Sequence, residues 1–183
     1  MKRKRLTVKE FLECKGKRQL SVLFVHNVEE ASAAEEAGID MIIAAYDIPQ
    51  YGIHATLNDV VEMRKAAPNC FFQSAVPHLT FASETELIRG AYKLMALDID
   101  CVYCANSIDW IKAMRRENIP VIGHVGLVPS KSSWLGGFRA VGKTSEEALK
   151  VLNDTIEKGF VEIKDFINQK PKFLRKEVEE IIY

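Results

Sequence analysis

Apolar and polar residues follow two regular patterns along the chain. Short, nearly continuous apolar runs alternate with longer segments in which apolar residues recur every three to four positions. The first pattern is typical of strands buried on both faces, and the second of helices with one buried face. The predicted strands are residues 20–25, 41–45, 70–76, 100–104 and 119–122. The predicted helices are residues 7–15, 28–37, 57–67, 83–97, 108–117 and 145–158.

Residues at the helix ends support these boundaries. Thr7 is followed three positions later by Glu10, which is the spacing of a capping box, and Ser83 has the same relation to Glu86. Gly38 follows the second helix, where a left-handed residue commonly ends a helix. Strand–helix–strand repetition of this kind indicates parallel strands joined by right-handed crossovers.

Five such units in series predict an α/β fold, either a (β/α) barrel or a doubly wound sheet. No GxGxxG follows the first strand, so the doubly wound dinucleotide fold lacks its best signal. A complete barrel usually needs about 250 residues, and this chain has 183. We therefore predict a parallel barrel of the TIM type that is truncated, with about five to six βα units.

The last part of the chain departs from the repeat. Residues 160–167 (FVEIKDFI) are compatible with a sixth strand or with the start of a helix, and residues 168–183 predict a charged C-terminal helix. A truncated barrel has open sheet edges, and exposed edges promote pairing between chains. We expect a single domain over residues 1–183 and a homo-oligomer in which the C-terminal helix contributes a contact.

Composition excludes several classes of partner. The formal net charge is zero, so bulk charge gives no reason to expect binding to nucleic acid or to a membrane surface. No apolar run approaches the roughly 18 residues that a membrane span needs. The basic start at residues 2–5 has no apolar core after it, unlike a secretory signal. We expect a cytoplasmic protein with a small-molecule ligand.

The four cysteines give no strong signal for a metal or a disulfide. Cys101 and Cys104 have the spacing of a CxxC motif, but residues three apart on a strand face opposite sides. Buried, reduced thiols are therefore expected.

Residues 119–144 combine the fifth strand with an unusually long loop. Connections between a strand and a helix are normally two to six residues long, and much longer ones are often functional. This loop carries the pair Gly136 and Gly137 between two aromatic residues, Trp134 and Phe138. We predict an active-site loop.

Polar residues occur where the predicted strands end, and reactive groups of parallel βα folds gather at these ends. His124, His78 and Asp47 are the candidate catalytic residues, and Asp47 is also the candidate metal ligand. Histidine suits acid–base chemistry near neutral pH. The candidate substrate-binding residues are Tyr46, Ser74, Tyr103, Asn106, Gly136 and Gly137.

Several motifs resemble the ketopantoate hydroxymethyltransferase family of the isocitrate lyase/phosphoenolpyruvate mutase superfamily. They are GHVGLVPS with LGGF and GKT in the long loop, and upstream TVKEFLECK, AEEAGIDMIIAAYD and TLNDVVEMRKAAP. The resemblance extends over roughly residues 6–160. It implies a barrel that transfers a hydroxymethyl group from methylenetetrahydrofolate to a small 2-oxo acid through an enolate.

The resemblance also implies Mg²⁺ held by acidic side chains at the ends of strands two to four. In this chain Asp47 is displaced by one residue from the first of these positions, and Ser74 and Ala75 replace the acid of strand three. Tyr103 stands in place of the family's carboxylate-binding lysine, and Ala105 in place of a metal-binding glutamate. For the catalytic glutamate of strand six, the chain offers Glu162 or Asp165.

Three functions remain open from the sequence. The first is a divergent ketopantoate hydroxymethyltransferase-like enzyme. The second is metal-independent acid–base or C–C bond chemistry on a different small acid, carried out by His78 and His124. The third is a non-catalytic paralogue that binds a ligand or serves as a structural partner.

Overall fold

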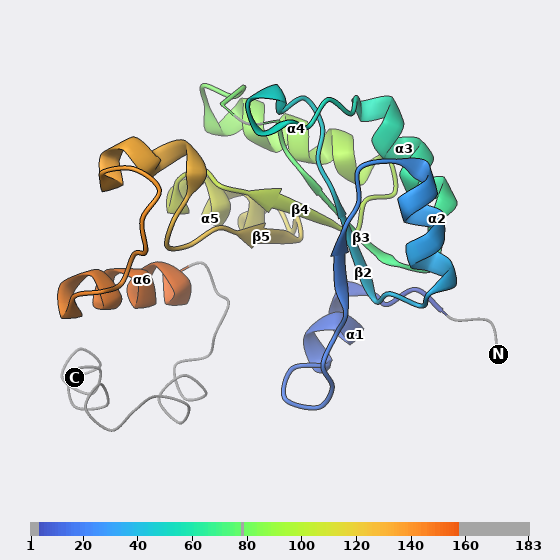
Figure 1. Cartoon of the computed structure of the whole chain (residues 1–183), viewed down its shortest axis with the longest axis horizontal. Coiled ribbons are helices and arrows are strands. Elements are labelled where there is room, and N and C mark those ends of the chain that lie inside the picture. The colour runs from blue at the N-terminus through green and yellow to red at the C-terminus, as the bar shows by residue number, and fades with distance from the viewer. Residues whose placement is uncertain (1–3, 78, 158–183) are drawn as a thin grey trace. The chain divides into compact units, whose positions relative to one another are not determined.

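The computed structural model describes residues 4–77 and 79–157, which form two compact units, one up to His124 and one from Val125 onward. The first unit is built around a five-stranded parallel sheet in the sequential order β1-β2-β3-β4-β5 (Figure 1). Its strands are β1 (Val22–Phe24), β2 (Met41–Ala44), β3 (Phe71–Ala75), β4 (Cys101–Cys104) and β5 (Val121–Gly123). Its helices are α1 (Val8–Glu13), α2 (Val28–Glu36), α3 (Leu57–Ala66), α4 (Glu84–Met95) and α5 (Ile108–Arg116), with a short 3₁₀ helix η1 (Pro49–Tyr51).

Helices α2 to α5 all pack on one face of the sheet, called here the outer face. Ile42, Phe72 and Val102 point from the strands into a core shared with buried residues of these four helices. A doubly wound sheet would carry helices on both faces. Sequential strand order with every crossover helix on one side is the arrangement of part of a (β/α) barrel, so the prediction of a truncated barrel is confirmed.

The opposite face, called here the inner face, corresponds to the interior of a barrel. Met41, Phe71 and Cys101 lie next to one another on it and are buried. Helix α1 covers this end of the inner face, where the ring of Phe11 stacks on Phe71 with centroids 4.6 Å apart. Cys101 faces inward while Cys104 belongs to the outer core, as their spacing predicts.

The predicted burial of the first strand is wrong. Val22, Leu23 and Phe24 of β1 keep 51%, 42% and 38% of their surface exposed. Within the described part of the chain β1 pairs only with β2, so its far edge has no neighbour. Only Val25, just beyond the strand, is buried in the outer core.

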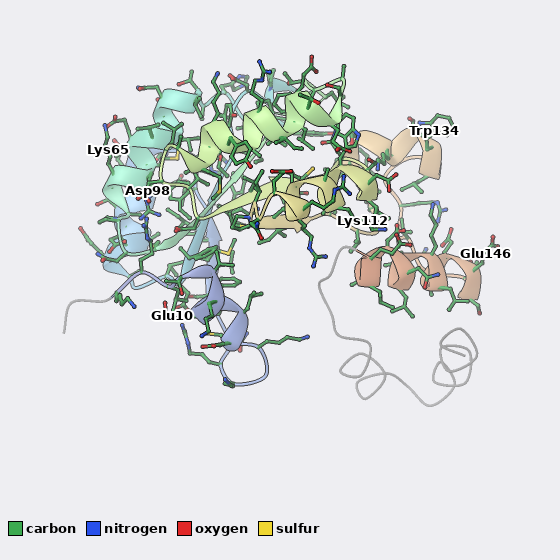
Figure 2. All side chains as sticks on the ribbon, turned by 180° about the vertical axis from the view of Figure 1, so that it is seen from behind. Glu10, Lys65, Asp98, Lys112, Trp134 and Glu146 are labelled. Atoms are coloured by element: carbon green, nitrogen blue, oxygen red, sulfur yellow. The ribbon has the colours of Figure 1, made fainter. Side chains whose placement is uncertain are left out.

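The second unit contains the 3₁₀ helix η2 (Pro129–Leu135) and helix α6 (Ser145–Glu157). Part of the predicted long loop is therefore helical. Gly136 ends η2 in the left-handed conformation, with φ 79°. Trp134 projects from η2 (Figure 2) and is 91% exposed, and Phe138 is 71% exposed. Residues 160–167, which are compatible with a sixth strand or with the start of a helix, and the predicted C-terminal helix lie outside the described residues. The single domain stays a prediction.

Candidate functional site

A phenol and an imidazole meet where β4 and β5 end. Tyr103 pairs in register with Ile122, and His124 follows two positions later, so both side chains belong to the inner face. The Tyr103 hydroxyl and His124 Nδ1 are hydrogen-bonded, and the two ring centroids lie 5.8 Å apart. The His124 backbone N–H donates to the Cys104 carbonyl at 3.2 Å and continues the sheet ladder beyond β5. The backbone hydrogen bonds of the sheet therefore fix the positions of the two Cα atoms that carry these rings.

Apolar side chains surround the Tyr103 ring. Ala45, Ile48 and Ala75 form a small buried cluster on this face, and Ile53 and Tyr103 pack against it. An antiparallel bridge between Ile48 and Ile53 folds the segment after β2 back on itself. Burial disfavours the charged phenolate and raises the pKa of Tyr103 to about 12, with a smaller contribution from Cys104. The hydroxyl consequently keeps its proton at neutral pH.

Tyr46 and Ser74 do not join this pair. Tyr46 follows Ala45, which lies on the inner face, and strand alternation turns it into the outer core, where it is buried. Burial, with the nearby charge of Asp47, raises its pKa to about 12. Ser74 is fully buried between Ala44 and Val102 of the outer core, and its Oγ has no hydrogen-bond partner among the described residues. A role in binding substrate at the inner face does not fit either position.

Asp47 lies beyond the end of β2 in the left-handed conformation, with φ 52°. Its backbone N–H donates to the Ala55 carbonyl at 2.9 Å, and its side chain is exposed. The turn thus holds the Asp47 backbone, but it does not bury the carboxylate beside Tyr103 in the apolar cluster.

The other residues predicted to belong to the site are Asn106, Gly136, Gly137 and His78, together with Glu162 and Asp165. Asn106 follows β4, and its Oδ1 accepts a long hydrogen bond from the Cys104 thiol at 3.6 Å. Gly136 and Gly137 belong to the second unit, with φ values of 79° and 101°. A Cβ atom added at either glycine would have no other heavy atom of the described residues within 4 Å. His78, Glu162 and Asp165 lie outside the described residues.

Sequence reasoning missed Gln73 and the contact between Tyr103 and His124. Gln73 is buried at 3% exposure on the inner face, in register between Ile43 and Cys101. Its signal was a single amide within the apolar run FFQSA, at an inward-facing position. The Tyr103–His124 contact depends on the register of β4 and β5, which the sequence pattern does not specify.

The described residues do not fit the Mg²⁺ site that the family resemblance implies. Mg²⁺ prefers near-octahedral oxygen coordination and usually includes carboxylates. Throughout residues 4–77 and 79–157, no three His, Cys, Asp or Glu side chains are grouped as metal ligands would be. The ends of β2, β3 and β4 supply one carboxylate, the exposed Asp47, along with Ser74, Tyr103 and Ala105.

The family model and the similar sequences of known proteins agree on one family. The family model described as ketopantoate hydroxymethyltransferase matches residues 5–159. The chain is 30% identical to a 3-methyl-2-oxobutanoate hydroxymethyltransferase of Pyrobaculum calidifontis, in a match over all of this chain and 74% of the relative. It is 29% identical to the enzyme of that name from Caldivirga maquilingensis, over 84% of this chain and 63% of the relative.

The chain spans only part of several relatives. A further 3-methyl-2-oxobutanoate hydroxymethyltransferase, from Kosmotoga olearia, is 30% identical over 80% of this chain and is covered over 60% of its own length. Among solved structures, 2,3-dimethylmalate lyase, of the PEP mutase/isocitrate lyase superfamily, matches with a TM-score of 0.55 and 13% identity. That match covers 84% of this chain and 61% of the lyase, and it supports the barrel-type fold alone.

Proposed function

Because the chain belongs to the ketopantoate hydroxymethyltransferase family, we propose that it transfers a hydroxymethyl group to a small 2-oxo acid. The observation that carries this proposal is the family match over residues 5–159, which includes all five strands and the long segment after β5. Methylenetetrahydrofolate is the proposed one-carbon donor. The chain covers under two thirds of several relatives, so its own activity needs a direct test.

The inner face offers groups suited to the first half of this reaction. The carbon next to the carbonyl of the acid must lose a proton before it can attack the one-carbon unit. Tyr103 and His124 lie together at the ends of adjacent strands, in a family of folds whose reactive groups gather there. A neutral phenol donates a hydrogen bond to a developing oxyanion, and an imidazole accepts a proton near neutral pH.

A small acid is the proposed substrate, and the proposed protein is a cytoplasmic homo-oligomer. None of the helices within the described segments is long and apolar enough to cross a bilayer. The exposed edge strand β1 supports pairing with another chain.

The direct test supplies 3-methyl-2-oxobutanoate with methylenetetrahydrofolate, and separately with formaldehyde, to the purified full-length chain. Mass spectrometry should detect the hydroxymethylated acid above an enzyme-free blank. The assay is run with added Mg²⁺ and again with EDTA. Absence of product in both conditions, at saturating substrate and with folded protein, would refute the proposal.

A second candidate function is that of a non-catalytic partner of a longer member of the family. The poor fit of the strand ends to Mg²⁺ favours it, as does the partial coverage of the relatives. Purification from the native host distinguishes the two: a self-contained homo-oligomer with turnover argues for the enzyme, and a stable complex with a full-length relative argues for the partner.

A further inference from the structure

Strand β1 forms an open edge of the sheet, and its backbone hydrogen bonds show which residues face that edge. The Ser21 carbonyl accepts from an N–H of β2 at 3.1 Å, and the Val25 N–H donates to a carbonyl of β2 at 2.9 Å. Alternate residues of a parallel strand bond to the same neighbour, so Ser21, Leu23 and Val25 face β2. Val22 and Phe24 therefore direct their N–H and carbonyl groups to the open edge, where the described part of the chain places no further strand.

The side chains along this edge are apolar and exposed. Val22, Leu23 and Phe24 each keep at least 38% of their surface accessible. Val22 is in register with Met41, so Val22 and Phe24 lie on the inner face and Leu23 lies on the outer face. Open backbone groups combined with exposed apolar side chains are the features by which an edge strand adds a strand from another chain.

We infer that β1 is a dimer interface, at which it pairs antiparallel with β1 of a second copy of this chain about a two-fold axis at Leu23. The proposal rests on the homo-oligomer of the proposed function, and it is independent of the transfer reaction. In this register Val22 of one copy lies opposite Phe24 of the other, and both residues direct their backbone groups to the open edge. Each such pair exchanges both of its N–H···O bonds, and the two-fold axis forms the pair twice.

Side-chain contacts across the axis favour this register. Opposite residues of antiparallel strands share a face, so Val22 meets the Phe24 ring of the second copy on the inner face, an aromatic–β-branched pair of the stabilising kind. Leu23 meets Leu23 of the second copy at a position without hydrogen bonds, where side chains approach most closely. A shift of one residue would set Val22 opposite Leu23, whose backbone groups already bond to β2, and the ladder would not form.

Charges on either side of β1 are complementary in the antiparallel arrangement. The loop before β1 carries Lys17 and Arg18, and the first turn of α2 carries Glu29 and Glu30. Lys17 stands six positions before Leu23 and Glu29 six positions after it, so the two-fold axis brings Lys17 of each copy near Glu29 of the other. Both residues are exposed. A parallel arrangement would set like charges together at both ends, so the charges select the antiparallel partner.

Disulfide trapping of the full-length chain tests the register. Leu23→Cys places one thiol of each copy at the axis, where opposite Cα atoms lie about 4.5 Å apart, within the range of a disulfide. Mild oxidation should convert most of this variant to a covalent dimer, which non-reducing gels detect and dithiothreitol reverses.

The matched control for trapping is Phe24→Cys, on the same exposed edge. Its thiol lies opposite Val22 of the second copy and away from its own counterpart, so it should cross-link far more slowly. The unchanged protein gives the background from Cys14, because the other three cysteines are buried.

Analytical ultracentrifugation tests the charge pairing. Lys17→Glu sets like charges together at both ends of the interface and should raise the dimer dissociation constant about 3- to 30-fold, as expected for two exposed pairs. The double variant Lys17→Glu/Glu29→Lys reverses both charges and should restore the constant. Lys93→Glu, at an exposed position on α4, controls for net charge and should leave it unchanged. Circular dichroism verifies that every variant is folded.

A covalent dimer of Leu23→Cys together with rescue by the double charge variant upholds the inference. Equal cross-linking of Leu23→Cys and Phe24→Cys overturns it, as does a dissociation constant that Lys17→Glu leaves unchanged, and the homo-oligomer then forms through another surface. A monomer at every concentration also overturns it and leaves residues 158–183 or a different protein as the occupant of this edge. The hydroxymethyl transfer assay on the same samples tests the reaction separately, so either result can fail without the other.

Discussion

Among individual residues, Arg64 is the most deeply buried charge described in the first unit. Its guanidinium donates to the carbonyls of Ala67 and Cys70 at 2.7 and 3.0 Å, and to the Asp100 carboxylate at 3.3 Å. It also lies 5.2 Å from the centre of the Phe72 ring. Asp100 in turn accepts from the Phe72 backbone N–H at 2.8 Å. These contacts tie α3 to the starts of β3 and β4.

Replacing Arg64 with Met should destabilise the protein strongly. The change leaves the Asp100 carboxylate and two buried carbonyls without their partner, and breaking a buried pair typically costs about 3–5 kcal/mol. Urea unfolding gives the free energy directly. Lys65→Met is the control, because the adjacent Lys65 forms an exposed pair with Glu62 and such pairs contribute little. Equal, small losses for both variants would contradict this account of Arg64.

A pH-dependent contribution should come from Asp98, which adopts the left-handed conformation after α4 (Figure 2). The bidentate hydrogen bonds from Arg5, at 2.7 and 3.0 Å, lower the pKa of Asp98 in the folded state. A carboxyl whose folded pKa is lowered stabilises the fold above its unfolded pKa of about 3.8, and the effect is lost as pH falls below that value.

Asp98→Asn preserves a side chain that tolerates the left-handed conformation and removes the charge. The stability difference between the unchanged protein and this variant should be largest near pH 6 and should shrink toward pH 3. Unfolding curves across this range measure it. A difference that stays constant with pH would show that the Arg5 contact does not act through the Asp98 charge.

At the scale of helices and strands, local signals explain most of the agreement between sequence and structure. The capping box at Thr7 is present with both of its hydrogen bonds, and Ser83 caps α4 as predicted. Every element predicted before residue 158 is found within two residues of its predicted ends. These features depend on neighbours a few positions away, which the sequence displays.

Features that depend on distant neighbours were harder to predict. The exposure of β1 depends on which strands flank it, and the contact between Tyr103 and His124 depends on strand register. Their positions at the ends of predicted strands predict that Tyr46 and Ser74 contact the substrate. The alternation along each strand instead turns both toward the helices.

Gly90 of α4 lies close to the ring of Phe81, which precedes this helix in the chain. A Cβ added at Gly90 would lie 2.4 Å from Cζ of Phe81, a ring that packs against the outer core. Gly90→Ala should therefore destabilise the protein by about 1–3 kcal/mol, the usual range for overpacking, although alanine favours helices.

The double substitution provides the control for this test. With Phe81→Ala already present, Gly90→Ala should become neutral or stabilising by up to about 1 kcal/mol, because only helix propensity remains. Thermal unfolding of the four proteins in this cycle measures the coupling. Additive effects would mean that the Phe81 ring does not limit this position.

At the scale of the whole molecule, the exposed apolar strand β1 is the feature that most requires a partner. Exposed apolar edges invite pairing with another chain, and natural proteins often protect them with lysine. Val22→Lys should therefore lower the self-association measured by analytical ultracentrifugation while leaving the circular dichroism spectrum unchanged. Tyr92→Lys, at an exposed site on α4, is the control. An unchanged association state in Val22→Lys would place the contact elsewhere.

The central claim is the proposal that this chain transfers a hydroxymethyl group to a small 2-oxo acid at a site that includes Tyr103 and His124. The most direct measurement is ¹³C NMR of 3-methyl-2-oxobutanoate with ¹³C-formaldehyde, once with Mg²⁺ and once with EDTA, comparing the unchanged protein with the Tyr103→Phe/His124→Gln double variant. We predict a hydroxymethyl carbon signal that grows with the unchanged protein and falls to the blank rate with the folded double variant. Equal signals from the two proteins, or none from either, would contradict the account.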